Sequence, residues 1–555
     1  MIRKTLIAVA LLSVAACMAA PPPASSPQTI APGDINVETM KEVTRILSSD
    51  EYEGRAPGTP GEAKSLATIV SQFSAAGLQP GNKGSWFQDV PLVEITGKNH
   101  SALTVSGGAK PLSFTYAKDF VAGTYRVTPR IDLANAELVF VGYGINAPEK
   151  GWNDYAGVDM RGKVAVILVN DPDYETPGLT GRFNGRAMTY YGRWTYKFEE
   201  AARQGAAAAL IVHDTFPAAY GWNVVESSWS GPAAYAQRAD DGASQTMING
   251  WVQKYVAEAM LASAGKDLAS LSAAAKQPGF RPVPLGVKAG LSFDNDIRRF
   301  ASKNVIGVLP GTSRSDEYVL FSAHYDHLGR CTANAAGDDI CNGAVDNASG
   351  VGALVALAEA NRKAGAAPRS LLFIALAAEE SGLLGSEYYG ANPVFPLAKT
   401  VGGVNMDSLS MTSPARDVSV IGGGKSELDA VLAEALRAEG RTATGDSAPE
   451  KGYYYRSDHF SLAKRGVPMF YVEGGHDLIA GGRAAGEAYA KDYTENRYHG
   501  PDDEYDAGWD WSGAAADVRL FYRLGRMLAQ SNDWPNWLPG DEFRRVRDES
   551  RSAAK

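Results

Sequence analysis

Histidine and acidic residues recur in the second half of this 555-residue chain, and three of these groups stand where a short apolar run ends. Five of the seven histidines fall between His324 and His499. Imidazole and carboxylate groups are common zinc ligands, so this pattern indicates metal chemistry. The groups are, in chain order, His324-x-Asp326, Asp346-Asn-x-Ser-Gly, Glu379-Glu380, Asn-x-Asp407 and Tyr498-His499.

These residues suffice for two zinc ions per chain. Each ion takes about four ligands, and a catalytic site leaves one position for water. His324, Asp346 and Asp407 would bind one ion, whereas Asp346, Glu380 and His499 would bind the other. A nucleophilic water between ions about 3.5–4 Å apart would complete both coordination shells. The number of ligands is sufficient if Asp346 binds both ions.

The adjacent pair Glu379-Glu380 divides into a ligand and a base. Neighbours on an extended chain point to opposite sides, so both cannot readily bind one ion. We therefore expect Glu380 to bind zinc and Glu379 to act as the general base of hydrolysis. Asp326 is placed to orient the imidazole of His324, and Tyr498 to aim its hydroxyl at the developing oxyanion.

Alternating strands and helices must position these side chains. Apolar runs at 318–321, 371–376 and 401–404 precede three of the motifs, and helical patterns cover 348–363, 426–439 and 514–530. This alternation predicts an α/β fold, with a mixed, largely parallel sheet sandwiched by helices. Such sheets carry their sites at the carboxyl ends of strands. A single motif of this kind is usually only a solvated surface, but their joint order favours a metal site.

The ordered motifs resemble those of peptidase family M28, which contains zinc aminopeptidases and carboxypeptidases. The resemblance covers about residues 38–535 and implies the zinc exopeptidase fold. It assigns the same five residues to zinc and Glu379 to the base. It also implies that the segment containing Arg456 and Asp458 lies near the substrate.

Residues 135–285 have a different sequence pattern, with short β-like runs, turns and aromatic-rich loops. Gly142-Tyr-Gly144, the strand entry at 161–166 and the Gly-Ala-rich strand at 205–212 resemble the protease-associated (PA) domain inserted in some exopeptidases. We therefore predict an N-terminal part of the peptidase domain at 36–134, a PA domain at 135–285, the catalytic domain at 286–540 and a polar tail at 541–555.

The N-terminus has the features of an export signal. Arg3 and Lys4 precede an apolar run at 6–16, too short to span a membrane. The run ends at Cys17 and resembles the lipobox of bacterial lipoproteins, which predicts a signal peptide at 1–16, a lipidated Cys17 and a tether at 17–35. The protein would then be anchored in the cell envelope, on the periplasmic side of a bacterial membrane. An ordinary signal cut near Ala19 or Ala20, with secretion, is the alternative.

The two remaining cysteines, Cys331 and Cys341, lie close together in a polar loop. In an oxidising compartment such a pair predicts a disulfide. A thiolate zinc site would require more Cys or His than this loop holds.

Composition and charge limit the classes of partner that the protein is expected to bind. The chain has 54 Lys and Arg against 63 Asp and Glu, a net charge of −9, and no basic stripe. This excludes nucleic acid as an expected partner. No apolar run after the first segment could span a bilayer, so membrane contact would come only through the lipid. The oligomeric state is not readable.

The motifs together predict an aminopeptidase acting on peptides. We prefer the amino end because no arginine cluster, of the kind that glutamate-type carboxypeptidases use to hold acidic substrates, lies near the motifs. Two alternatives stay open, a carboxypeptidase of the same family and an acyl transferase like the glutaminyl cyclases, which resemble this fold but use one zinc. A binding protein that has lost its ligands is disfavoured because every ligand is present.

Overall fold

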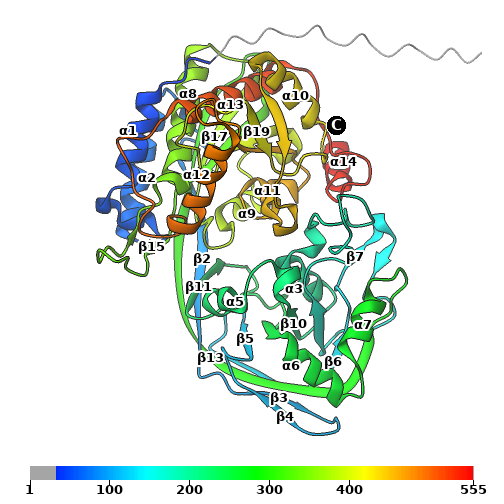
Figure 1. The fold of residues 1–555 in the computed structure, drawn as a ribbon. Helices are drawn as coiled ribbons and strands as arrows, with labels where there is room; N and C mark the ends of the chain where they lie inside the picture. The colour runs from blue at the N-terminus through cyan, green and yellow to red at the C-terminus, as the bar shows by residue number, and fades with distance from the viewer. Residues whose placement is uncertain (1–32, 554–555) are drawn as a thin grey trace, which may run out of the picture.

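Two long antiparallel strands, β2 (Phe87–Lys98) and β13 (Val283–Leu309), run through both bodies of the molecule (Figure 1). This computed structural model describes residues 33–553. One end of the β2–β13 ribbon pairs with the sheet of an upper, catalytic body, and the other end pairs with the strands of a lower, β-rich body. The chain enters the upper body first, descends through β2 and returns through β13.

The upper body is built on the expected mixed, largely parallel sheet. Its four central strands are mutually parallel, and antiparallel strands flank them on both sides. The strand order is β13, β17 (Arg369–Leu376), β14 (Arg314–His324), β18 (Thr400–Asn405), β21 (Met469–Gly474), β19 (Asp417–Val420) and β20 (Thr442–Gly445).

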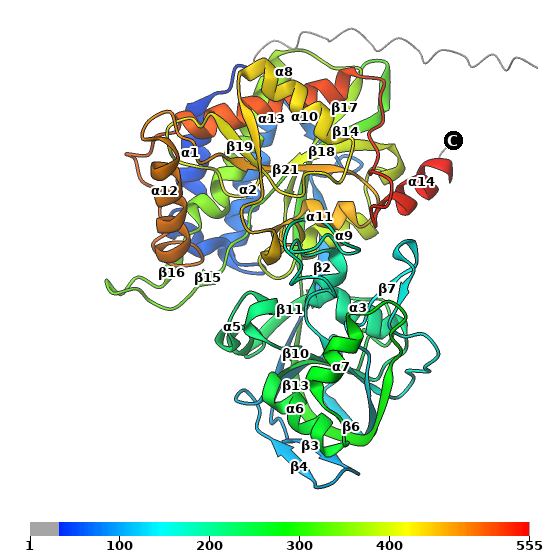
Figure 2. The ribbon, with the colours of Figure 1, turned by 45° about the vertical axis from the view of Figure 1, so that its right-hand side comes forward.

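Helices cover both faces of this sheet (Figure 2). Side chains alternate along a strand, so Val319 and Phe321 of β14 enter one core while Leu320 enters the other. The first core contains residues of α1 (Val37–Leu47), α2 (Pro60–Ala75), α8 (Ser349–Lys363), α10 (Leu428–Glu439) and α13 (Ser512–Gln530). The opposite core contains residues of α9 (Leu384–Ala391) and α11 (His459–Ala463).

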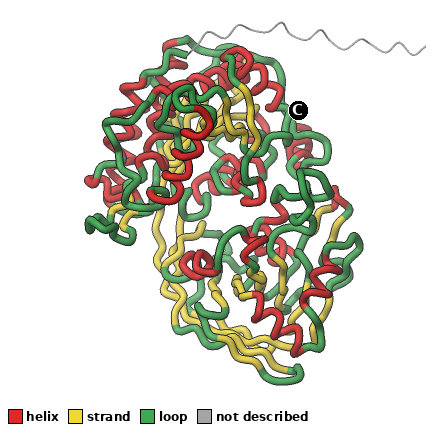
Figure 3. The backbone as a smooth tube through the Cα atoms, viewed as in Figure 1, coloured by secondary structure: helices red, strands yellow, loops and turns green. Residues whose placement is uncertain are grey.

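The lower body has its own hydrophobic cores and its own short strands (Figure 3). One core draws residues from Leu103 to Phe293, so the β-rich body begins before the expected boundary at 135. The reason is that β3 (Leu103–Ser106) and β6 (Arg130–Phe140) pair with the lower end of β13, and β5 (Phe120–Gly123) pairs with β12 (Ile248–Gln253). Its central strands are β9 (Val164–Leu168) and β10 (Ala208–His213). Assignment of this body as a PA domain stays a prediction.

The two bodies also meet through Tyr190, from the loop before α3 (Trp194–Arg203). Its ring packs against Phe460 and Tyr455 of the catalytic body, with centroids 5.2 and 6.3 Å away. Glu199 of α3 forms an ion pair with Lys464 at 3.3 Å. At least this part of the aromatic-rich segment therefore serves packing between the bodies.

Within residues 33–553, no helix combines the length and the apolar character that a bilayer crossing requires. The predicted signal peptide, Cys17 and most of the predicted tether lie outside the described residues.

Candidate active site

The expected ligands converge at the carboxyl ends of the parallel strands. His324 is the last residue of β14, the pair Glu379-Glu380 follows β17, and Asp407 follows β18. Because these three strands are neighbours and parallel, their ends share one edge of the sheet. Asp346 joins them from the turn before α8, and His499 from the loop after α12 (Gly482–Asn496).

Three side chains form a first metal-binding group. The Nε2 atom of His324 lies 3.1 Å from Oδ1 of Asp346 and 3.3 Å from Oδ1 of Asp407. His324 and Asp346 are buried, with exposed side-chain fractions of 1% and 4%. This is the group that the ligand count assigned to one ion.

The other oxygen of Asp346 faces a second group. Nε2 of His499 lies 3.3 Å from Oδ2 of Asp346 and 3.1 Å from Oε2 of Glu380. Asp346 therefore offers one oxygen to each group, as a bridging ligand must. His499 is 36% exposed, so the second group lies nearer to solvent.

The donor set fits zinc. Tetrahedral ligands at zinc bond lengths of about 2.0–2.1 Å lie about 3.3 Å from one another, close to the separations in both groups. Among the described residues, the ion pairs of Asp346, Glu380 and Asp407 are all with histidines. Three neighbouring carboxylates without a lysine or arginine ion pair favour a bound cation.

Glu379 is buried and its backbone is held in place. The carboxylate of Asp326 accepts hydrogen bonds from the backbone N–H groups of Glu379 and Glu380, at 3.1 and 3.3 Å. Burial raises the pKa of the Glu379 carboxyl well above its ordinary value, and the charges of Asp407 and Glu380 act in the same direction, whereas His324 opposes them. A carboxyl with a raised pKa is suited to both accepting and returning a proton near neutral pH.

Comparison with known proteins supplies the deciding observation. Residues 304–522, which contain every expected ligand and the base, match the model of peptidase family M28. This segment is an M28 peptidase domain.

The chain is also similar to curated proteins and solved structures. A stretch of 139 residues is 30% identical to Aminopeptidase NAALADL1 of mouse, and it spans 23% of this chain but only 17% of the mouse protein. Among solved structures, an aminopeptidase from Aneurinibacillus sp. strain AM-1 aligns with a TM-score of 0.48 and 22% identity, over 90% of this chain and 95% of that chain. The zinc aminopeptidase BSAP from Bacillus subtilis aligns with a TM-score of 0.42 and 17% identity, over 92% and 99%.

Asp326 contacts His324 through a different atom from the one expected from the sequence. The Nδ1 atom of His324 lies 3.2 Å from the backbone carbonyl oxygen of Asp326, whereas the Asp326 carboxylate is 3.8 Å away. The carboxylate instead holds the Glu379-Glu380 backbone. Asp326 therefore connects the ends of β14 and β17.

Asp503 lies near the ligands and was not expected from the sequence, whereas His327 was expected either beside the ligands or at the surface. Asp503 accepts hydrogen bonds from the backbone N–H groups of Val345 and Asp346, both at 3.0 Å, and so fixes the bridging residue. His327 is fully buried, and its Nδ1 lies 2.6 Å from Oε1 of Glu380, the oxygen that does not face His499. In the sequence it directly follows the HxD motif.

His327, Asp346 and Glu380 are themselves close enough to hold a metal ion. His499, however, faces the Oδ2 and Oε2 atoms that converge with it, whereas His327 reaches only Oε1 of Glu380. We therefore assign His327 to orienting Glu380 and keep His499 in the ligand set.

The residues expected near the substrate divide by exposure. Tyr498 is 48% exposed and stacks on the His499 ring, with centroids 3.9 Å apart. Arg456 is exposed, whereas Asp458 is only 1% exposed, and burial raises the pKa of its carboxyl to about 7. Between them, Ser457 donates a hydrogen bond to Oδ2 of Asp407 at 2.6 Å. The segment thus reaches from solvent to the ligands.

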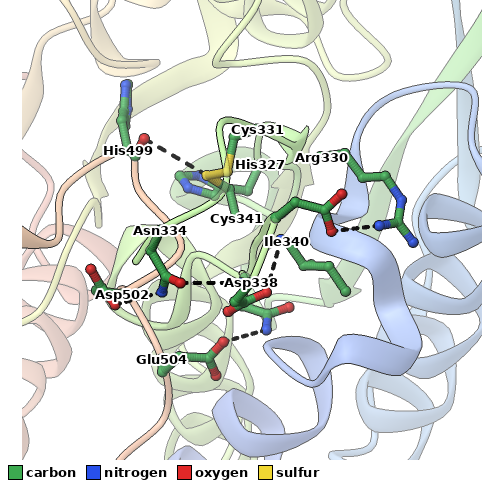
Figure 4. The surroundings of a disulfide bond; sticks show 12 residues. His327, Arg330, Cys331, Asn334, Asp338, Ile340, Cys341, His499, Asp502 and Glu504 are labelled. Carbon is green, nitrogen blue, oxygen red and sulfur yellow. Dashed lines mark hydrogen bonds and ion pairs between the residues drawn. A yellow bond between two sulfur atoms is a disulfide. The ribbon is translucent and has the colours of Figure 1, made fainter. Parts of the chain in front are cut away.

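The expected disulfide joins Cys331 to Cys341 and closes the loop between the His324 and Asp346 motifs (Figure 4). The sulfur of Cys341 lies 3.7 Å from the backbone carbonyl oxygen of His499. Asn334 of the same loop donates a hydrogen bond to Asp502 at 2.9 Å. The stapled loop therefore packs on the segment that carries His499.

Proposed function

We propose that the protein is a two-zinc aminopeptidase with Glu379 as its general base. The observation that carries this proposal is the placement of Asp346, which presents Oδ1 to His324 and Oδ2 to His499. His324 and Asp407 would complete one zinc site, and Glu380 and His499 the other. The M28 match supports peptide hydrolysis.

The chain's own residues would carry the proton through the reaction. Bound zinc supplies a Lewis acid that activates water and polarises the peptide carbonyl. Glu379 accepts a proton as water adds to that carbonyl, and it returns the proton to the leaving amine as the C–N bond breaks. Tyr498, which is half-exposed and stacks on His499, is placed to donate a hydrogen bond from its hydroxyl to the developing oxyanion.

Attack at the amino end is supported by the acidic character of the site. Glu379, Asp407 and Glu473 cluster there, and burial, followed by repulsion from Asp407, raises the pKa of Glu473 to about 7. A substrate ammonium group is attracted to such a cluster. The similarity of part of the chain to the mouse aminopeptidase NAALADL1 agrees with this direction.

We expect free peptides to be hydrolysed and the same peptides, once acetylated at the α-amine, to be left intact. Acetylation removes the charge that the carboxylates attract and adds bulk beside the scissile bond, and loss of productive positioning can cost several kcal/mol. Mass spectrometry of the products over time would measure this. Equal rates on both peptides, with residues released from the carboxyl end, would make the enzyme a carboxypeptidase.

One observation favours that carboxypeptidase alternative. The sequence showed no arginine cluster. In the fold, however, Arg193 of the β-rich body lies close enough to Arg456 for their charges to interact. Burial and, second, the positive charge of Arg456 lower the pKa of Arg193 to about 10. Nε of Arg193 has no hydrogen-bond partner among the described residues. Two arginines at the seam between the bodies could hold a substrate carboxylate.

We also propose that Cys17 carries a lipid anchor. Cys17→Ala should move the protein from the membrane fraction to the soluble fraction, because a lipid chain supplies membrane affinity and no helix within residues 33–553 could cross a bilayer. Labelled fatty acid incorporation into the wild type is the direct measurement. A mature protein that begins at Pro21 and carries no label would make the segment an ordinary signal peptide.

A further inference from the structure

Arg55 is a buried cation in the Glu53-Gly54-Arg55 motif that connects α1 to α2. Its side chain is fully buried and donates four hydrogen bonds, every one of them to a backbone carbonyl oxygen. The acceptors are Tyr325 at 2.7 Å, Leu47 at 2.6 Å, Asn342 at 2.6 Å and Gly343 at 3.0 Å.

Three of those acceptors, in Tyr325, Asn342 and Gly343, belong to the segments that carry the proposed ligands His324 and Asp346. Tyr325 stands between His324 and Asp326, and Gly343 lies three residues before Asp346. One planar guanidinium therefore fixes the distance between the end of β14 and the turn that holds the bridging carboxylate. Since a guanidinium presents its donors in a rigid planar fork, moving one acceptor would also disturb the hydrogen bonds to the other acceptors.

The charge of Arg55 also belongs to the site. No carboxylate forms an ion pair with this guanidinium in the part of the chain that the structure describes, although a buried cation without a counter-charge is costly. Asp326, Asp503, Asp346 and Glu380 are the acidic groups whose charges act on it. These are two proposed ligands and the two residues that hold the ligand backbones.

The backbone around Arg55 is shaped to bring it there. Glu53, Gly54 and Arg55 all have positive φ angles, of 48°, 65° and 55°. A Cβ atom on Gly54 would lie 2.5 Å from the carbonyl oxygen of Cys341 and 2.6 Å from that of Gly329, so only glycine fits against the stapled loop. The motif thus packs directly on the loop that joins the two ligand segments.

We propose that Arg55 is a positioning residue that sets the spacing of the two zinc sites by tying His324's strand end to Asp346's turn. The proposal rests on the proposed two-zinc function. It assigns the N-terminal segment, which lies outside the M28 match, a part in building the metal centre.

The test is zinc affinity, measured by chelator competition, in Arg55→Lys. Lysine keeps the charge but loses the fork, so we expect at least one zinc to bind about 10–100-fold more weakly, the usual cost of removing an outer-shell partner of a metal site. The absorption spectrum of the cobalt-substituted protein should change as well. The matched control is Arg547→Lys, since Arg547 is also buried and donates to the carbonyls of Leu397 and Val401, away from the ligands.

The proposal would be overturned if Arg55→Lys kept the wild-type zinc affinity and cobalt spectrum while its melting temperature fell as much as that of Arg547→Lys. If Arg55→Lys does not fold, Asp50→Ala takes its place, because Asp50 holds the side chain of Asn342 at 2.7 Å in the same loop. Weaker zinc binding in Asp50→Ala supports the proposal, and unchanged binding contradicts it. A wild type that binds no zinc would instead refute the proposed function.

Discussion

Glu379→Gln should retain its fold and both zinc ions and lose peptidase turnover by about 10²–10⁴-fold, the range that general acid–base catalysis contributes. The amide is nearly the same size as the carboxylate, so the packing and the hydrogen bonds to Asp326 through the backbone N–H are kept. It cannot, however, accept the proton of the attacking water. The loss should fall on kcat.

Steady-state kinetics and elemental analysis of one preparation of Glu379→Gln distinguish loss of the general base from a folding defect. Zinc content equal to the wild type, together with a large loss of kcat, supports the base assignment. Turnover near the wild-type value would mean that another group carries the proton.

Asp346→Ala should disturb metal binding more than any other single ligand substitution. Within residues 33–553, Asp346 is the carboxylate that forms ion pairs with both His324 and His499, through separate oxygens. Removing it leaves each site a ligand short and removes the charge that balances two cations. We expect the variant to bind at most one zinc and to lose nearly all activity.

His324→Ala and Glu380→Ala are the matched controls, because each removes a ligand from one site only. Each should weaken one zinc and leave the other. Two tightly held zinc ions in Asp346→Ala would place the bridge on another residue.

Much of the catalytic body could be read from the sequence because its strands and helices follow regular apolar patterns. The helix expected over residues 348–363 is observed at Ser349–Lys363, and the last long helix was expected to begin at residue 514 and begins at Ser512. The strands that carry His324, Glu379 and Asp407 were likewise expected near their observed positions. Motifs at strand ends could therefore be placed on one edge of the sheet.

Local capping and long-range pairing account for what the pattern did not reveal. α2 begins at Pro60, five residues before Ser65, and a local cap marks this start: the Thr59 side chain accepts a hydrogen bond from the Glu62 backbone N–H at 3.3 Å. β13 extends for 27 residues because strands of both bodies pair along it, which no local window of sequence displays. α12, whose residues are mostly exposed, was missed for lack of an apolar stripe.

The same limit applies to the site. The ligands were found because their types and order are informative, but Asp503 and Arg55 act on backbone atoms of distant segments. Such contacts leave no spacing signature in the chain. The approach of Arg193 to Arg456 likewise depends on how the two bodies meet.

The central claim is that two zinc ions, bridged by Asp346, drive hydrolysis from the amino end of peptides. Its most direct test is a zinc titration of the metal-free protein, with the products of one unblocked peptide followed by mass spectrometry at each addition. The account predicts stepwise loss of residues from the amino end, with activity that stops rising at two zinc ions per chain. No hydrolysis at any zinc content, or full activity at a single zinc, would contradict it.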